Sequence, residues 1–314
     1  MSNAAYFISN DDFEAEILPF GATLQALKVR GRNVVLGREN LTAQADGYLG
    51  ATVGRYPNRI GGAEYSYDGE TYYLDANEGQ NMLHGGAGGW SLLTWDVLEV
   101  GQSFILLGIT SADGDQGFPG NVTATAKFEL LDNGLQVTYT ATTDKATPLG
   151  MTNHVYFNLS DEPTIDNHTI QLNASGWTPT DDEGIPLGNI DDFDDTGLDM
   201  SKPRKIAEVR ADATEHGSLR GPGIDNNFVI AGSGLRDMAA ITSPDGSLAM
   251  AVRSNAPCLQ VYDGNMLKGQ PWKQFAGVAL EAQPYVDAPN QDAFPPGIVK
   301  PGERYEHVIQ WLFA

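Results

Sequence analysis

The sequence predicts an all-β fold of antiparallel strands, either a sandwich or a barrel, on three observations. Apolar and polar residues alternate with a period of two over several long runs, which is typical of strands with one buried face. Asn-Gly and Asp-Gly pairs separate several of these runs, as in short hairpin turns. Helical periodicity is scarce, so few helices are expected between strands, and parallel pairing is disfavoured.

The clearest hairpin is expected around Asp132-Asn133-Gly134. On both sides of this turn, apolar side chains recur at every second position, and two alternating runs around an Asn-Gly pair predict a hairpin with one buried face. The expected buried positions are Val122, Ala124, Ala126, Phe128 and Leu130 in the first strand and Leu135, Val137, Tyr139 and Ala141 in the second.

Other elements follow the same pattern. Asp68-Gly69 joins AEYSY to TYYL, Asp245-Gly246 joins MAAITS to LAMAVRS, and the C-terminal run RYEHVIQWLF alternates again. One helix is expected over Lys205–His216, because Ile206, Val209 and Ala213 recur there with helical spacing.

Composition favours one domain over residues 1–314. Apolar residues make up 41% of the 314, enough for a sizeable core, and charged residues make up 19%, too few for a disordered polyanion. The length alone is compatible with about two domains. No linker or internal repeat divides the chain, however, and large all-β folds reach this size as one unit.

The formal charge of −22 excludes duplex nucleic acid as a partner, since that binding needs Lys and Arg against phosphates. It argues less firmly against anionic membranes and phosphorylated substrates. The N-terminal residues lack the basic and apolar regions of a signal peptide, and no apolar run is long enough to span a bilayer. We therefore expect a soluble cytoplasmic protein.

Cys258 is the single cysteine, which excludes an intramolecular disulfide and a Cys-based zinc site, and we expect it to be buried. Residues 181–199 hold eight acidic residues and no basic one. The spacing of Asp192, Asp194, Thr196 and Gly197 resembles the start of a calcium loop, but Pro203 stands where such a loop ends on Glu. A solvated acidic loop is the better interpretation, and no metal or other cofactor is expected.

Three ionisable residues lie in settings that suggest chemistry. His154 enters the aromatic run VYFNL, His84 precedes four glycines within five positions, and Glu281 follows the strand-like Val278–Leu280. Each also fits a structural role, since a histidine can be hydrogen-bonded in a core and a glutamate can lie on the polar face of a strand. Burying a carboxylate is costly unless it is paired. Arg59 can donate to hydroxyls in a forked geometry, Asp225 follows a Gly-Pro-Gly turn, and Gln260 alternates out of a strand.

Taken together, several segments resemble the aldose 1-epimerase (galactose mutarotase) family, in order and over nearly the whole chain. They are Gly54–Ile60 (GRYPNRI), Leu83–Gly86 (LHGG) with Trp90 and Trp95, Thr152–Leu159 (TNHVYFNL), Gly184–Gly188 (GIPLG), Asp225–Phe228 (DNNF), Gln260–Asn265 (QVYDGN), Leu280–Gln283 (LEAQ) and Pro301–Tyr305 (PGERY). Any one of these would be weak evidence, but their combination is specific.

The resemblance implies a large antiparallel β-sandwich with a sugar cleft, and an isomerase acting on a small aldose without a cofactor. It implies Glu281 as general base and His154 as general acid, with Asn58, Arg59, His84, Asp225 and Gln260 positioning the sugar hydroxyls. Asp263 stands where the family commonly has Thr, so it is expected to alter hydroxyl recognition. The state of assembly stays open between monomer and homodimer.

The chemistry adds two expectations. A carboxylate and an imidazolium are needed at rest, so we expect Asp225 or Glu281 to raise the pKa of His154. Trp90, Tyr156 and Phe294 are candidates to stack on the sugar, although core packing is the better interpretation for any single one of them.

Three alternatives remain at the level of sequence. A hexose-6-phosphate 1-epimerase would need a cluster of cations for its phosphate. A non-catalytic sugar-binding module could use the same fold. A glycosidase could use Glu281 and Asp225 as its carboxylate pair, but this would leave His154 without a role.

Overall fold

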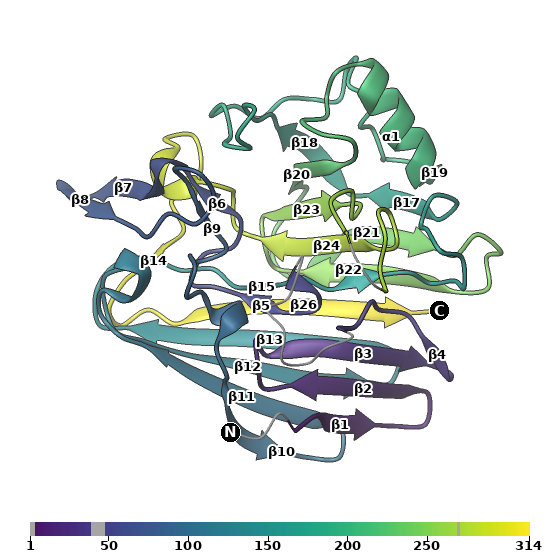
Figure 1. Ribbon diagram of the computed structural model, residues 1–314, viewed down its shortest axis with the longest axis horizontal. Coiled ribbons are helices and arrows are strands. Elements are labelled where there is room, and N and C mark those ends of the chain that lie inside the picture. The colour runs from purple at the N-terminus through teal and green to yellow at the C-terminus, as the bar shows by residue number, and fades with distance from the viewer. Residues whose placement is uncertain (1–3, 39–47, 269–270) are drawn as a thin grey trace.

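The computed structural model describes residues 4–38, 48–268 and 271–314, and its strands form two packed layers (Figure 1). One layer is a nine-stranded sheet in which every pair of neighbours is antiparallel. Its strands, in spatial order, are β10 (Asp96–Val100), β11 (Phe104–Ser111), β12 (Val122–Leu131), β13 (Gly134–Thr143), β26 (Tyr305–Phe313), β22 (Ala249–Ser254), β21 (Arg236–Thr242), β17 (Thr169–Leu172) and β19 (Arg204–Lys205).

The facing layer combines two antiparallel sheets, which a bridge between Val35 and Phe157 connects. The first contains β1 (Tyr6–Ser9), β2 (Phe13–Leu18), β3 (Thr23–Val29) and β4 (Arg32–Asn33). The second, in spatial order, contains β16 (Tyr156–Phe157), β24 (Val278–Gln283), β23 (Cys258–Tyr262), β20 (Asp225–Ile230) and β18 (Ala174–Thr178).

Short elements complete the described chain. Four two-stranded pairs join β5 (Thr52–Val53) with β15 (Thr152–Asn153), β6 (Arg59–Ile60) with β9 (Met82–Leu83), β7 (Glu64–Tyr67) with β8 (Glu70–Tyr73), and β14 (Thr147–Pro148) with β25 (Ile298–Val299). Single 3-10 turns lie at Gly61–Ala63, Trp90–Leu92, Asp115–Gly117 and Ala288–Asn290.

The main hydrophobic core fills the space between the two layers, because alternate residues of each strand point inward. Burial alternates along β12, and the buried residues of β13 are the four expected ones together with Gly134 and Thr143. The same core includes Phe13 and Leu24 from one layer and Phe128 and Trp311 from the other. The all-β antiparallel sandwich is therefore confirmed.

The predicted elements are found where the patterns placed them. The three hairpins form as β12–β13, β7–β8 and β21–β22, and the C-terminal run is β26. The predicted helix is α1 (Ile206–Glu215), with Ile206, Val209 and Ala213 buried. Cys258 is buried as expected. No helix among the described residues has the length and apolar character needed to cross a membrane.

Strand β24 is unusual because all six of its residues are buried, whereas an antiparallel strand with one wet face alternates. Val278, Leu280 and Ala282 point into the main core. Alternation therefore places Glu281 on the opposite face, where other parts of the chain cover it. A carboxylate buried in this way requires an explanation from its surroundings.

Candidate active site

The pairing of β20, β23 and β24 places polar side chains in one row on the face away from the core. Gln260 lies opposite Glu281 on one side and opposite Asn227 on the other. The residues next to them along each strand, such as Leu259 before Gln260 and Leu280 before Glu281, belong to the main core. The period of two thus gives this sheet one apolar face and one face able to bind a polar molecule.

His154 lies between β15 and β16, where the main chain holds it against the segment before β5. Its N–H donates to the carbonyl of Ala51 over 2.8 Å, and its carbonyl accepts from the N–H of Gly50 over 2.9 Å. Its ring lies among four other rings, with centroids 5.0 Å from Tyr156, 5.4 Å from His84, 5.7 Å from Tyr48 and 6.2 Å from Tyr262. These contacts leave the imidazole little freedom to turn.

His154 and Glu281 face each other, with Nε2 3.5 Å from Oε1. Their side chains are only 6% and 2% exposed. Burial lowers the pKa of His154 to about 4, although a backbone hydrogen bond and the charge of Asp225 act in the opposite direction. Burial together with repulsion from Asp225 raises the pKa of Glu281 well above its ordinary value.

The expectation that a carboxylate raises the pKa of His154 above its ordinary value is therefore wrong, although Asp225 acts in the expected direction. Desolvation outweighs the attraction of Asp225, because the imidazolium would be almost completely removed from water. The lowered pKa of His154 and the raised pKa of Glu281 both favour the uncharged state of the pair, a carboxylic acid beside a neutral imidazole. This state has the same number of protons as a carboxylate beside an imidazolium, so a single proton transfer within the pair interconverts them.

Asn58 and His84 form the opposite side of the site, and both have left-handed backbone angles, with φ of 60° and 51°. The N–H of Asn58 donates to His84 Nδ1 over 3.0 Å, and the N–H of His84 donates to the carbonyl of Asn58 over 3.0 Å. Gly85 packs so closely that a Cβ there would lie 2.0 Å from the carbonyl oxygen of Gly54. Strained angles held by such contacts are typical of functional sites.

Arg59 follows Asn58, and its guanidinium is held by two partners. Its Nε and one terminal nitrogen donate to the two carboxylate oxygens of Glu78 over 2.6 and 2.9 Å, and its other terminal nitrogen donates to Asn58 Oδ1 over 3.2 Å. This forked pairing fixes the direction of the guanidinium.

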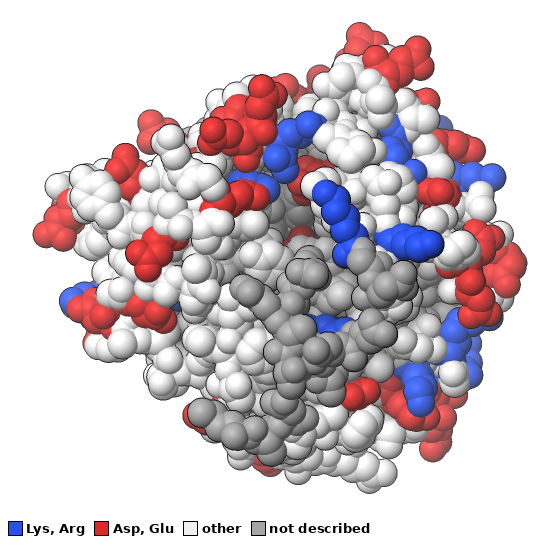
Figure 2. Space-filling view, in the orientation of Figure 1, with Lys and Arg blue, Asp and Glu red and all other residues white. Residues whose placement is uncertain are grey.

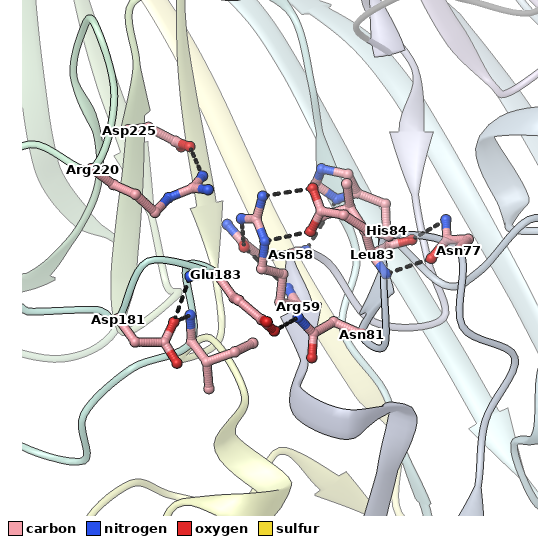
Figure 3. Close-up of polar contacts among 12 residues, drawn as sticks. Asn58, Arg59, Asn77, Asn81, Leu83, His84, Asp181, Glu183, Arg220 and Asp225 are labelled. Carbon is pink, nitrogen blue, oxygen red and sulfur yellow. Dashed lines mark hydrogen bonds and ion pairs between the residues drawn. The ribbon is translucent and has the colours of Figure 1, made fainter.

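Asp225, at the start of β20, is bound from two sides. A terminal nitrogen of Arg220 donates to its Oδ2 over 2.9 Å, and Gln260 Nε2 donates to its Oδ1 over 2.7 Å. Figure 3 shows Arg220 and Asp225 on one side of the site and Asn58, Arg59 and His84 on the other.

Between these groups lies a cavity of about 730 Å³, within the usual range for small-molecule sites. It opens as a hollow on the face seen in Figure 2, where Lys and Arg gather at its rim. His154, Glu281, Asn58, Arg59, His84 and Asp225 line it. Gln260 does not line it directly but adjoins it, through its bond to Asp225 and its register with Glu281.

His84, His154 and Glu281 are the one group of metal-ligating types that the described residues bring together, with ligand atoms within 4.8 Å of one another. The hydrogen bonding of His84 does not suit a metal. Its Nδ1 already accepts the N–H of Asn58. Burial lowers its pKa well below the ordinary value, so the ring is neutral and its one proton lies on Nε2. His84 thus offers the cavity a donor instead of a lone pair.

Several residues of the cavity wall were not singled out from the sequence, among them Tyr48, Glu78, Arg220, Tyr262, Lys268 and Trp272. Tyr262 could have been found, because it lies in the same alternating run as Gln260. Glu78, Arg220 and Trp272 lie in turns whose local sequence has no periodicity, so only the fold brings them to the site.

Core packing is confirmed for two of the three candidate aromatic residues, and Asp263 does not line the cavity. Trp90 is buried against Trp95, and Phe294 stacks on Tyr285, so of the three proposed aromatic residues only Tyr156 lines the cavity. Asp263 is fully buried and pairs with Arg210 at 2.7 Å instead of lining the cavity.

The acidic stretch forms the long connection between β18 and β19. Asp181 Oδ1 accepts the N–H groups of Glu183 and Ile185, and Glu183 accepts from Asn81 over 2.8 Å near the rim of the site. In the part of the chain that the structure describes, no three acidic groups of this stretch come together as metal ligands.

Comparisons with known proteins agree with this site. The family model described as aldose 1-epimerase matches residues 5–311. The aldose 1-epimerase of Escherichia coli K12 is 35% identical over 97% of this chain and 93% of its own length. The galactose mutarotase of Homo sapiens is 32% identical over 98% of this chain and 93% of its own length.

Solved structures agree as well. An aldose epimerase homologue from C. elegans superposes with a TM-score of 0.91 at 29% identity, covering 99% of both chains. Galactose 1-epimerase from Lactobacillus acidophilus NCFM superposes with a TM-score of 0.87 at 26% sequence identity, and the match covers 99% of this chain and 94% of that one. The resemblance is thereby confirmed: the chain belongs to the aldose 1-epimerase family and is an isomerase.

Proposed function

We propose that this protein interconverts the α and β anomers of a free hexose, galactose or glucose, with Glu281 as general base and His154 as general acid. The observation that carries the proposal is the pair itself, a buried carboxylate and a buried imidazole 3.5 Å apart at the wall of a sugar-sized cavity. The names of the relatives, aldose 1-epimerase and galactose mutarotase, support the same reaction and sugar class.

The reaction needs the pyranose ring to open and close again. The Glu281 carboxylate removes the proton of the C1 hydroxyl, and the protonated His154 gives a proton to the ring oxygen as the bond between C1 and that oxygen breaks. The C1–C2 bond of the open aldehyde rotates, and the same two groups act in reverse to close the ring. Each positioned acid or base typically contributes about 10²–10⁴-fold to the rate.

The proton already held by the pair supplies the acid. Burial favours that proton on Glu281. Binding of hydroxyl groups replaces lost water around both side chains, which favours the charged tautomer, a carboxylate beside an imidazolium. The proton then moves from Oε1 to Nε2 without any exchange with solvent. Among the described residues, Glu281 Oε2 and His154 Nδ1 have no hydrogen-bonding partner, so both remain available to a bound molecule or to water.

The other wall residues are suited to binding hydroxyls. Arg59, Asp225 and Gln260 are fixed by hydrogen bonds, and His84 presents its Nε2–H. The two arginines of the lining, Arg59 and Arg220, are each paired with a carboxylate. This pairing offsets the charge of both arginines, so of the cations in the lining only Lys268 has no carboxylate partner among the described residues, and no cluster of unpaired cations is present there for a phosphate.

The test is polarimetry of fresh α-D-glucose and α-D-galactose with and without the protein. We expect the optical rotation to reach its equilibrium value faster with the protein present. Equal rates with and without it, alongside measurable sugar binding, would identify a binding module instead. Glucose 6-phosphate as the sole accelerated substrate would favour the phosphate-specific epimerase, and release of reducing sugar from a glycoside would favour a glycosidase.

A further inference from the structure

Asp263 and Arg210 form a buried ion pair just outside the cavity. The Asp263 side chain has 0% exposure, and Arg210 Nε lies 2.7 Å from its Oδ2. Arg210 projects from α1, and a terminal nitrogen of its guanidinium donates to Asp166 over 2.8 Å. The guanidinium also lies over the ring of Phe275, 3.6 Å from the centroid. Four separate segments of the chain therefore meet at this one side chain.

Asp263 touches both segments that form the adjacent wall of the cavity. It directly follows Tyr262 and precedes the lining residues 265–268. Its N–H donates to the carbonyl of Ile224 over 3.1 Å. A Cβ on Gly223 would lie 2.4 Å from Asp263 Oδ1, so the other lining segment, residues 220–223, packs directly on this carboxylate.

The position of the Asp263 carboxylate depends on Arg210. A carboxylate removed from water needs a partner, and breaking a buried pair from one side leaves an uncompensated charge that draws water or moves the chain. Any such movement would displace residues 220–223 and 265–268, because both contact Asp263. His154 lies between β15 and β16 and Glu281 lies on β24, so neither belongs to the two segments that adjoin Asp263, and both should stay in place.

We propose that Arg210 is a positioning residue which, through Asp263, sets the cavity wall formed by residues 220–223 and 265–268 and thereby the affinity for the sugar. This role rests on the proposed function. The pair acts on binding in the ground state and the transition state alike, so its loss should raise KM and spare kcat.

The experiment compares Asp263→Asn, Arg210→Met and Arg210→Lys with the wild type, measuring kcat and KM by polarimetry and hexose affinity by calorimetry. We expect Asp263→Asn and Arg210→Met to raise KM and Kd about tenfold, with kcat within about twofold of the wild type. Arg210→Lys keeps a cation beside Asp263 and should recover part of the loss.

Asp166→Asn is the matched control, because it removes the other ion pair of Arg210 and leaves the Asp263 pair intact. It should leave KM unchanged. The proposal is overturned if KM stays unchanged in folded Asp263→Asn and Arg210→Met, or if Asp166→Asn raises KM equally. It is also overturned if Asp263→Asn fails to fold, because that result would assign the ion pair to stability alone.

The wild-type measurements separate this inference from the proposed function. A wild type that binds hexose without accelerating mutarotation would refute the proposed function, and the calorimetric Kd series would still test Arg210. A wild type that binds no hexose would refute both.

Discussion

Replacing Glu281 with Gln tests the proposed base with the smallest change of shape. The amide nearly matches the carboxylate in size but cannot accept a proton from the C1 hydroxyl. Glu281 is 2% exposed and lines the cavity, so the change acts directly at the place where the sugar would bind. We expect folding and sugar binding to survive and turnover to fall.

The size of the loss follows from the site. A general base contributes about 10²–10⁴ in rate, and each tenfold corresponds to about 1.4 kcal/mol, so the barrier should rise by about 3–5 kcal/mol. Burial raises the pKa of Glu281, which means that the fold disfavours its charged form. The contribution of Glu281 to the free energy of unfolding is therefore present at low pH, where the residue is protonated, and is lost as the pH rises through its raised pKa. The Gln variant should match or exceed the wild-type Tm at pH 8.

The assay is polarimetry of fresh α-D-galactose with matched amounts of protein, together with thermal unfolding at pH 8. Glu14→Gln is the control, because it makes the same chemical change at an exposed surface pair on β2. It should leave the rate unchanged. A Glu281→Gln rate within tenfold of the wild type, in a folded protein, would refute the assignment of the base.

Three further predictions follow from the site. The kcat/KM profile should fall below about pH 4, where His154 takes up a second proton for the pair. It should fall again above the ordinary pKa range of glutamate, where the pair loses its one proton from Glu281. A flat profile from pH 3 to 9 would contradict the shared proton. Gly85→Ala should lower Tm by several degrees more than Gly69→Ala. Both glycines have a left-handed φ, but only Gly85 packs against the backbone of another segment, at Gly54. Equal losses of Tm would contradict this. Exhaustive dialysis against a chelator should leave the rate unchanged, because His84 presents a donor; a loss restored by a divalent cation would overturn that interpretation.

The fold could be predicted well because period-two alternation and two-residue turns are local properties of the chain. Strands β12 and β13 and their buried face follow directly from the positions of Val122–Leu130 and Leu135–Ala141. The order of strands in the nine-stranded sheet could not be predicted in this way. It joins β13 to β26 across most of the chain, and the alternation within each strand gives no information about its neighbour.

The site shows the same division between local and long-range information. The resemblance supplied seven residues, of which six line the cavity and Gln260 adjoins it. It did not supply Arg220 or Glu78, which act as ion-pair partners and carry no local pattern. The pKa of His154 was predicted in the wrong direction because the sequence reveals which charges are present but not how completely water is excluded. The pairing of Asp263 could not be predicted for a related reason, since its partner Arg210 lies on a helix 53 positions earlier in the chain.

The central claim is that His154 and Glu281 act together on one hexose in this cavity. A crystal structure of the Glu281→Gln variant with bound galactose tests it most directly. The account predicts the C1 hydroxyl within hydrogen-bonding distance of residue 281 and the ring oxygen within hydrogen-bonding distance of His154 Nε2. A hexose that binds elsewhere, or one whose anomeric carbon points away from both side chains, would contradict it.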